Sequence, residues 1–178
     1  MFNFHDKMKV LISHYNGITH DEAGNIPWFQ KDSPDVQFFK QQTMSGTQNV
    51  IMGHKTFNSM PKLRNRTNIV LCKKSVQQNV FGHEADFTIS SPKFFESACL
   101  IGGINTILSY MTSKILNKYN SIFFLTEYSF IEKLPATEHK DLFSFLKPVC
   151  NIFSDKFEHK TLGYCSFDVN MYVPLDLY

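Results

Sequence analysis

The stretch NIPWFQKDSPDVQFFKQQTMSGTQNVIMGHKTFNSMPKLRNRTNIVL, residues 25–71, contains the pattern that decides the fold. It predicts a helix with Ser33 as N-cap, Pro34 at the first helical position and Asp35 in the first turn. Such a start suits the backbone N–H groups that have no partner inside a helix. The helix is expected to end near Ser45, where a glycine follows.

Outward from this helix, the chain alternates short apolar segments with amphipathic ones. Buried strands are expected at 9–13, 49–53, 67–71, 87–89, 98–101 and 121–130, and further helical segments at 54–60, 91–97 (a single turn) and 105–116. Apolar and polar residues then alternate at a period of two over 151–159 and 164–173, which predicts an antiparallel hairpin. The sequence therefore predicts one three-layer α/β domain, residues 8–178 after a short extension at 1–7. Helices flank a mixed, mostly parallel sheet with an antiparallel C-terminal hairpin.

Composition and charge exclude several classes of protein. The 178 residues carry a net charge of +2, too nearly balanced to favour nucleic acid or a membrane surface as a partner. No apolar run is long enough to cross a bilayer. The seven His and the four Cys lack the spacing of metal ligands, so no metal site is expected. The thiols (Cys72, Cys99, Cys150 and Cys165) are predicted to be reduced and mostly buried, in a cytoplasmic protein.

Two junctions between a strand and a helix could bind phosphate. Gly53 follows one predicted strand and the pair Gly102–Gly103 follows another, and glycine lets a backbone approach an anion closely. Lys73 and Lys74 follow a third strand. In open α/β sheets, ligands bind beyond the carboxyl ends of strands, so together these positions suit a dinucleotide with an extra phosphate. At either junction alone, a glycine that only makes a tight turn remains the alternative.

Asp35 has two interpretations. An acid in the first turn of a helix commonly serves only as a partner of the helix dipole. Here, however, Val36 and Phe39 mark the inward face, and the only Trp of the chain, Trp28, precedes the helix. An acid beside an aromatic-lined cavity would be desolvated and able to handle protons.

Only two of the 18 Lys and Arg residues are Arg, and these, Arg64 and Arg66, lie two residues apart. A guanidinium matches a carboxylate through two parallel hydrogen bonds, so the pair indicates a planar anion as ligand. Ordinary surface Arg is the alternative for either residue.

Taken together, six motifs in this order resemble those of the dihydrofolate reductase family. They are IPW (26–28), SPDVQFFKQQT (33–43), VIMGHKTFNSM (50–60), RTNIVL (66–71), IGG (101–103) and FFLTE (123–127). Each motif alone is modest evidence, whereas their order and spacing are specific. The resemblance extends from about Met8 to Val173.

The resemblance implies an eight-stranded sheet and the NADPH-dependent reduction of 7,8-dihydrofolate to tetrahydrofolate, which supplies one-carbon metabolism and thymidylate synthesis. It also implies a monomer that binds antifolate-type inhibitors. Asp35 would hydrogen-bond the pterin and promote protonation of N5, with Thr126 holding both Asp35 and the pterin amino group. Arg66 would bind the glutamate α-carboxylate, which leaves Arg64 as a surface residue. The other implied substrate-binding residues are Ile12, Ile26, Val36, Phe39, Met60, Leu63 and Ile101.

The resemblance also assigns a cofactor site. Ser13 and His14 would line the nicotinamide end, and Lys73 would meet the 2′-phosphate, which favours NADPH over NADH. The other implied cofactor-binding residues are Ile18, Trp28, Gly53, His54, Lys55, Thr56, Leu71, Cys72, Gly102, Gly103, Ile104, Asn105 and Thr106. The loop at 16–25 takes the place of the family's mobile active-site loop.

Four departures from the family pattern stand out. Thr19 rather than Gly follows Ile18 in the loop, about two extra residues separate Trp28 from Asp35, and the segment before residue 101 lacks a good helix. Ile107 replaces the usual aromatic residue. Two other functions stay open: a related reductase of another heterocycle, such as the pyrimidine reductases of riboflavin synthesis, and a folate-binding protein without turnover.

Overall fold

The structure of the chain is a computed structural model, which describes residues 6–21, 24–74, 78–129 and 143–175. Its helices are α1 (Pro34–Met44), α2 (His54–Ser59) and α3 (Ile104–Thr112). Its strands are β1 (Met8–His14), β2 (Asn49–Gly53), β3 (Thr67–Leu71), β4 (Phe87–Ile89), β5 (Cys99–Gly102), β6 (Ser121–Ser129), β7 (Leu146–His159) and β8 (Gly163–Pro174).

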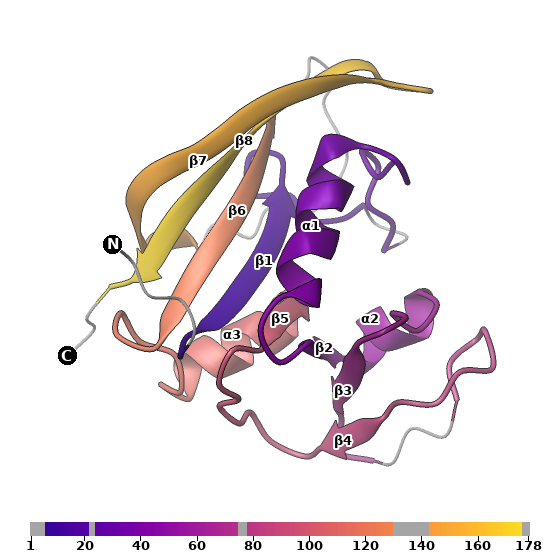
Figure 1. Cartoon of the computed structure of the whole chain (residues 1–178), viewed down its shortest axis with the longest axis vertical. Helices are drawn as coiled ribbons and strands as arrows, with labels where there is room; N and C mark the ends of the chain where they lie inside the picture. The colour runs from indigo at the N-terminus through magenta and orange to yellow at the C-terminus, as the bar shows by residue number, and fades with distance from the viewer. Residues whose placement is uncertain (1–5, 22–23, 75–77, 130–142, 176–178) are drawn as a thin grey trace.

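The strands form one eight-stranded sheet in the order β4-β3-β2-β5-β1-β6-β8-β7 (Figure 1). Neighbours from β4 to β6 are parallel, and β8 is antiparallel to both β6 and β7. The predicted fold class is confirmed, including the antiparallel hairpin at the C-terminal end of the sheet.

Helices cover both faces of the parallel part of the sheet. Val50 and Met52 of β2 belong to a buried cluster with Phe57 of α2, whereas Ile51 between them belongs to the cluster that contains Ile107 of α3. Because neighbouring side chains of a strand point to opposite faces, α2 and α3 lie on opposite sides of the sheet.

The helix α1 packs on the same face of the sheet as α2. Phe38 meets Phe124 of β6 edge-on, with ring centroids 5.6 Å apart, and also contacts Phe153 of β7. At the other end of the helix, the buried Lys9 of β1 donates hydrogen bonds to the backbone oxygen of Gln42 (2.9 Å) and to Ser45 Oγ (2.6 Å). These bonds occupy a carbonyl in the last turn of α1, which has no partner within the helix, and so tie that end to the sheet.

One predicted element is wrong and another is shorter than expected. Residues 91–97 form no helical turn; instead the N–H of Lys93 donates to the hydroxyl of Tyr110 and its carbonyl accepts from it. These bonds take the place of bonds within a helix. The helix α3 ends at Thr112 rather than at 116. The extension at 1–5, residues 22–23 of the loop, and Phe130 at the predicted strand end lie outside the described residues.

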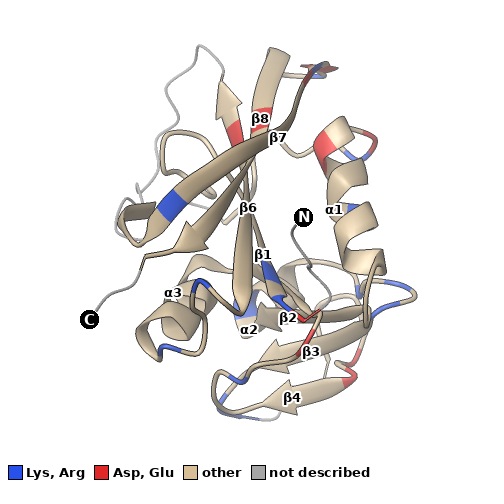
Figure 2. Ribbon diagram, turned by 60° about the vertical axis from the view of Figure 1, so that its left-hand side comes forward, with Lys and Arg blue, Asp and Glu red and all other residues tan. Residues whose placement is uncertain are grey.

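Charged residues are spread along many elements rather than collected on one (Figure 2). This distribution agrees with the nearly balanced net charge of +2. Within the described part of the chain, no helix combines the length and the apolar character needed to span a membrane.

The prediction for the thiols is partly wrong, because Cys150 is exposed and Cys72 only half-buried, while Cys99 and Cys165 are buried.

Candidate active site

The centre of the sheet is where the strand order reverses, between β1 and β5. The ladder between these two strands holds the pairs Lys9–Cys99 and Val10–Leu100, after which β1 continues beside β6 and β5 beside β2. The chain leaves β1 toward helices on one face and leaves β5 toward α3 on the other. Such a switch point is the usual ligand site of an open α/β sheet. Ile12 and Ile101, both predicted to bind substrate, lie on either side of this split.

Asp35 lies at the start of α1, half-buried, and both of its carboxylate oxygens are occupied. Oδ1 accepts hydrogen bonds from the Ser33 hydroxyl and from the Val36 N–H (2.9 Å), and Oδ2 accepts one from the Tyr128 hydroxyl. Ser33 is the N-cap as predicted, but its side chain holds Asp35 and caps no backbone N–H. The bond from Val36 fits the structural interpretation of Asp35, whereas the two hydroxyls indicate a carboxylate fixed in orientation.

An aromatic pair lies beneath this carboxylate. Trp28 is 1% exposed and stacks on Tyr128 with ring centroids 5.4 Å apart, and its indole N–H donates to Ser13 Oγ (3.1 Å). Burial, together with the charge and hydrogen bond of Asp35, raises the pKa of Tyr128 far above its usual value. Tyr128 is therefore a hydrogen-bond donor over the whole physiological range of pH. Trp28 is too buried to contact a ligand directly, so any effect it has on a ligand would pass through its neighbours Ser13 and Tyr128.

Thr126 lies on β6 two residues before Tyr128, so both side chains share the sheet face that carries Asp35. It is paired with Ser13 of β1 and is 7% exposed. Among the described residues, the donors to Asp35 are Ser33, Val36 and Tyr128, and Thr126 is not one of them. Its predicted role toward Asp35, through a water molecule, stays a prediction.

The apolar residues predicted to wall the substrate lie around the same region. Phe39 of α1 is partly buried and packs in the cluster of Trp28 and Tyr128, and Leu63 packs in the cluster of Phe57. Val36 and Met60 are half-buried, whereas Ile26 is 43% exposed. A single exposed Ile is not unusual on a protein surface, and this one is available to a ligand.

The Arg66 side chain is hydrogen-bonded to the C-terminal end of α1, the helix that carries Asp35 in its first turn. Its Nη1 donates to Thr43 Oγ1 of α1 (2.8 Å) and its Nε to the backbone oxygen of Arg64 (2.9 Å), while the Arg64 side chain is exposed. Asp35 in the first turn and Thr43 in the last place an acid and a guanidinium at opposite ends of α1. The structure thus separates the two Arg as the resemblance implies.

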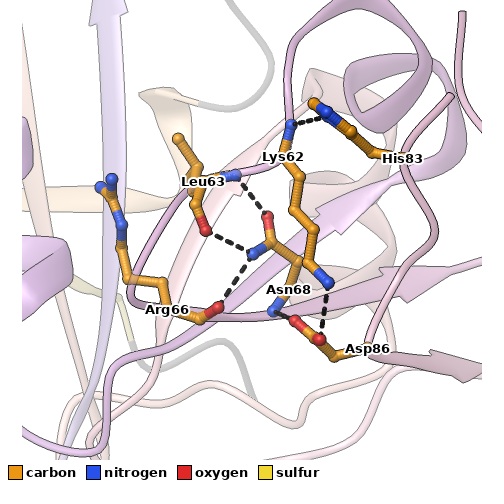
Figure 3. A network of polar contacts seen from close by, with 6 residues as sticks. All are labelled: Lys62, Leu63, Arg66, Asn68, His83 and Asp86. Atoms are coloured by element: carbon orange, nitrogen blue, oxygen red, sulfur yellow. Dashed lines mark hydrogen bonds and ion pairs between the residues drawn. The ribbon is translucent and has the colours of Figure 1, made fainter. Parts of the chain in front are cut away.

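The backbone of residues 63–66 is fixed by a buried Asn that the sequence prediction missed (Figure 3). Asn68 donates to the carbonyls of Leu63 (2.9 Å) and Arg66 (3.1 Å) and accepts from the Leu63 N–H (3.1 Å). Its own N–H donates to Asp86 (2.7 Å), which is also paired with Lys62 (2.7 Å). Asn68 is a polar residue inside the otherwise apolar strand TNIVL, and this was the sequence feature that could have predicted its structural role.

A hollow of about 470 Å³ is lined by residues 62–67 with His83 and Asp86. Arg66 and Leu63 are among its lining residues, but Asp35 is not, and it includes no residue of α1 or of the split between β1 and β5. The guanidinium of Arg66 points away from the Lys62–Asn68–Asp86 network (Figure 3). We therefore centre the candidate site on Asp35 and Arg66 rather than on this hollow.

The two predicted phosphate junctions lie side by side and interlock. A Cβ added to Gly53 would lie 2.2 Å from Thr106 Oγ1, and one added to Gly103 would lie 3.3 Å from Thr56 Oγ1. The start of α2 therefore packs against the start of α3, with a side chain from each meeting the glycine of the other. Gly102 has a φ of +127°, a conformation that L side chains rarely adopt. Gly53 and Gly103 thus allow the close approach, and Gly102 allows the backbone conformation between them.

The other predicted cofactor residues lie next to these two junctions or at or after the ends of β1 and β3. Lys55, His54, Asn105, Lys73 and the neighbouring Lys74 are exposed, Ile18 is 5% exposed and Ile104 is 8% exposed, and Leu71 and Cys72 are half-buried at the end of β3. Ile107, which replaces the usual aromatic residue, is buried in the core beneath α3.

His14 and Glu127 form a second polar cluster at the ends of β1 and β6, which sequence reasoning did not identify as a unit. Because the Gly17 N–H donates to His14 Nδ1 (3.0 Å), neutral His14 carries its proton on Nε2, which faces Glu127 (3.2 Å). Glu127 also accepts from Asn170 (2.6 Å) and Tyr172 (2.9 Å). The hydrogen bond from His14 first, and those from Asn170 and Tyr172, outweigh burial and lower the pKa of Glu127.

Among the described residues, no three His, Cys, Asp or Glu side chains lie close enough together to hold a metal ion.

Comparisons with known proteins bear on the family and the fold. The family model described as dihydrofolate reductase matches residues 13–119, which include Asp35, Gly53 and Arg66 but not Thr126. The fold is similar to that of dihydrofolate reductase from Enterococcus faecalis complexed with NADP(H) and RAB-propyl, at 20% sequence identity and a TM-score of 0.61. That match covers 97% of this chain and 99% of the other. A comparison with curated proteins found no match.

The sequence match covers more than half of the chain, and the order of strands and helices agrees along almost its whole length with that of a solved member. This chain belongs to the dihydrofolate reductase family of oxidoreductases.

Proposed function

We propose that this chain reduces 7,8-dihydrofolate to 5,6,7,8-tetrahydrofolate with NADPH, with Asp35 as the acid of the reaction. The observation that carries the proposal is a carboxylate held by two hydroxyls and a backbone N–H at the start of α1, against β6. Arg66 at the other end of α1 supports a substrate with a heterocycle at one end and a carboxylate at the other.

The residues present fit NADPH. Gly53, Gly102 and Gly103 leave no Cβ where a pyrophosphate would meet the backbone, and Gly103 is the N-cap of α3, whose first N–H groups would be available to it. Lys55 and Thr56 lie beside these glycines, and Lys73 at the end of β3 is exposed and suited to a 2′-phosphate. Ser13 and His14, at the end of β1, would lie at the nicotinamide end. When bound, NADPH supplies the hydride to C6 of the pterin.

The protein's own residues bind and orient the substrate and manage one proton. Asp35 would hydrogen-bond the pterin and promote protonation of N5, and Thr126 would assist at the pterin amino group. Carbonyls of Ile12 and Ile101 would accept from the same amino group at the split of the sheet. The apolar walls from Ile26, Val36, Phe39, Met60 and Leu63 would exclude water, which strengthens these polar contacts.

We expect the enzyme to act as a cytoplasmic monomer on this small-molecule substrate and to bind antifolate-type inhibitors. Its product would serve one-carbon metabolism and thymidylate synthesis. The nearly balanced net charge supports neither nucleic acid nor a membrane surface as a partner.

Loss of NADPH absorbance in the presence of dihydrofolate tests the reaction. Asp35→Asn keeps the shape of the side chain but cannot ionise, so we expect kcat at neutral pH to fall by about 100-fold or more. The Kd for NADPH, measured by titration, should change little, because Asp35 lies on α1 and the cofactor glycines lie at the starts of α2 and α3. Equal loss of turnover and NADPH binding would contradict the role given to Asp35.

Two other outcomes would favour the alternative functions. Tight binding of dihydrofolate with no turnover would indicate a folate-binding protein. NADPH oxidation with an aminopyrimidine precursor of riboflavin, but not with dihydrofolate, would indicate the related reductase. The geometry of Arg66 argues against the latter, because a clamp for a glutamate carboxylate has no purpose there.

A further inference from the structure

We propose that the Tyr128 hydroxyl is a positioning group for Asp35, which donates to Oδ2 and fixes the direction in which the carboxylate meets a substrate. The proposal rests on the proposed function in one respect, namely that Asp35 is the acid of the reaction. Tyr128 acts through Asp35 and not on the substrate itself.

The contacts of Asp35 leave little acceptor capacity for a substrate. An ionised carboxylate has about four acceptor positions, two on each oxygen. Ser33 and the Val36 N–H occupy both positions on Oδ1, and Tyr128 occupies one on Oδ2. The substrate must therefore meet Asp35 mainly through Oδ2, the oxygen whose direction the Tyr128 hydroxyl fixes.

Packing in turn fixes the direction of that hydroxyl. The Tyr128 ring is 3% exposed, stacks on Trp28, and meets Phe157 and Phe167 of the hairpin at centroid distances of 6.3 and 5.4 Å. Tyr128 lies on β6, two residues from Thr126 and on the same face. A side chain held on four sides by aromatic rings and strand backbone loses little further freedom when its hydroxyl binds.

Hydrogen bonds to the ionised form of an acid favour ionisation. Tyr128 remains a donor because burial, with the charge of Asp35, raises its pKa. The other titratable group that faces Asp35 is the buried Cys165 of β8, whose pKa is raised by burial first and by Asp35 second. His159 of β7 lies near the segment that leads into α1, bonded to the backbone oxygen of Phe29 (3.2 Å).

Tyr128→Phe removes the hydroxyl and keeps the ring. We expect the midpoint of the pH profile of kcat/KM to move upward, since one hydrogen bond to a carboxylate is lost. The kcat/KM for dihydrofolate at neutral pH should fall about tenfold, while the KM for NADPH stays unchanged. Tyr110→Phe, which removes a buried hydroxyl bonded to the Lys93 carbonyl under α3, is the matched control and should leave the midpoint in place.

A second readout does not need turnover. Trp28 is the only Trp and stacks on Tyr128, so a pH-dependent transition in its fluorescence in the free protein is the expected signal of a change at the contact between Tyr128 and Asp35. Asp35→Asn should abolish this transition, which assigns it to Asp35 and not to Cys165 or His159. Tyr128→Phe should shift it upward. If wild-type protein fails to reduce dihydrofolate but shows this shift, the proposed function fails while the positioning role stands.

An unchanged midpoint in Tyr128→Phe, or an equal shift in Tyr110→Phe, would overturn the proposal. So would a lowered thermal stability with no change in the midpoint, because that is the mark of a packing role alone. If Tyr128→Phe does not fold, 3-fluorotyrosine placed at position 128 alone decides the matter. Its more acidic hydroxyl donates more strongly, so the midpoint must move downward if the role is correct.

Discussion

At the scale of single residues, the partners of Arg66 predict its effect on the substrate. Thr43 and the Arg64 carbonyl hold one side of the guanidinium, and Nη2 makes no hydrogen bond to the described residues. Arg66→Lys keeps a positive charge but loses the planar fork, so the KM for dihydrofolate should rise by about 10- to 100-fold with little change for NADPH. Steady-state kinetics measure both constants.

Arg64→Lys is the control for Arg66→Lys, two residues away and exposed. Its kinetics should equal those of the wild-type protein. A comparable rise in KM for both variants would mean that the whole basic segment attracts the substrate, rather than one guanidinium.

Single residues also show what the sequence could and could not predict about the site. Asp35, Gly53 and Arg66 were predicted from the order and spacing of the six motifs, since each residue alone also allowed a structural interpretation. Ser33 was identified only as a cap, and Tyr128 and Asn68 were not identified. Tyr128 reaches Asp35 across 93 residues of sequence, and strand periodicity alone could not tell which helix its face meets.

At the scale of elements, the interlocked starts of α2 and α3 predict the behaviour of Gly53. Its φ is −77°, which any residue can adopt, so Gly53→Ala adds only the volume of a methyl group. That methyl would lie 2.2 Å from Thr106 Oγ1 and 3.7 Å from the N of Gly103, where we expect the pyrophosphate to approach. The Kd for NADPH should rise at least tenfold, as measured by titration, with a smaller effect on folate binding.

The double variant Gly53→Ala/Thr106→Ala separates packing from cofactor binding. It removes the nearest contact of the new methyl group but leaves the methyl itself in place. Thermal stability should recover relative to Gly53→Ala while NADPH binding stays weak. Recovery of both would mean that Gly53 serves only the packing of the two helices.

Most elements were predictable because their apolar runs are bounded by polar or glycine residues. The exception, the helical turn at 91–97, shows the limit of local signals. A single turn is costly to nucleate on its own. Tyr110, from a distant helix, offers the backbone of Lys93 both a donor and an acceptor, and Phe94 and Phe95 pack on the core without a helix.

The extra residues between Trp28 and Asp35 are explained by a contact with the β7–β8 hairpin. Gln30 donates to the Glu158 carbonyl (3.3 Å) and accepts from the Lys160 N–H (3.1 Å), which ties the extra residues to the tip of the β7–β8 hairpin. No local pattern could predict this contact, because the two partners are joined only by the completed sheet.

At the scale of the whole molecule, Glu127 joins the parallel part of the sheet to the antiparallel hairpin through His14 on β1 and Asn170 and Tyr172 on β8. Its pKa is lowered in the folded protein, so its stabilising contribution is fully present above about pH 4.5, the value for the unfolded chain, and is lost as the pH falls through the lowered value. Glu127→Gln should reduce the free energy of unfolding at neutral pH by roughly 1–2 kcal/mol.

Urea unfolding at neutral and at acidic pH checks this expectation. The difference between wild-type protein and Glu127→Gln should shrink as the pH falls below the lowered value. Glu96→Gln, a substitution of an exposed acid, should leave the stability unchanged. A difference that stays constant with pH would show that the ionised form of Glu127 does not matter.

The helix α1 sets a length as well as a shape. Asp35 and Thr43 are eight positions apart, and at 1.5 Å per residue the helix places the acid and the support of Arg66 about 12 Å apart along its axis. An inserted or deleted residue between them would change this spacing by only about 1.5 Å but would turn one end by about 100° relative to the other. The helix therefore fixes the separation of the two groups, which can change only by whole residues and only together with a rotation. Substrates of a different length cannot be accommodated by small changes within it, only by shifting the contacts at one end.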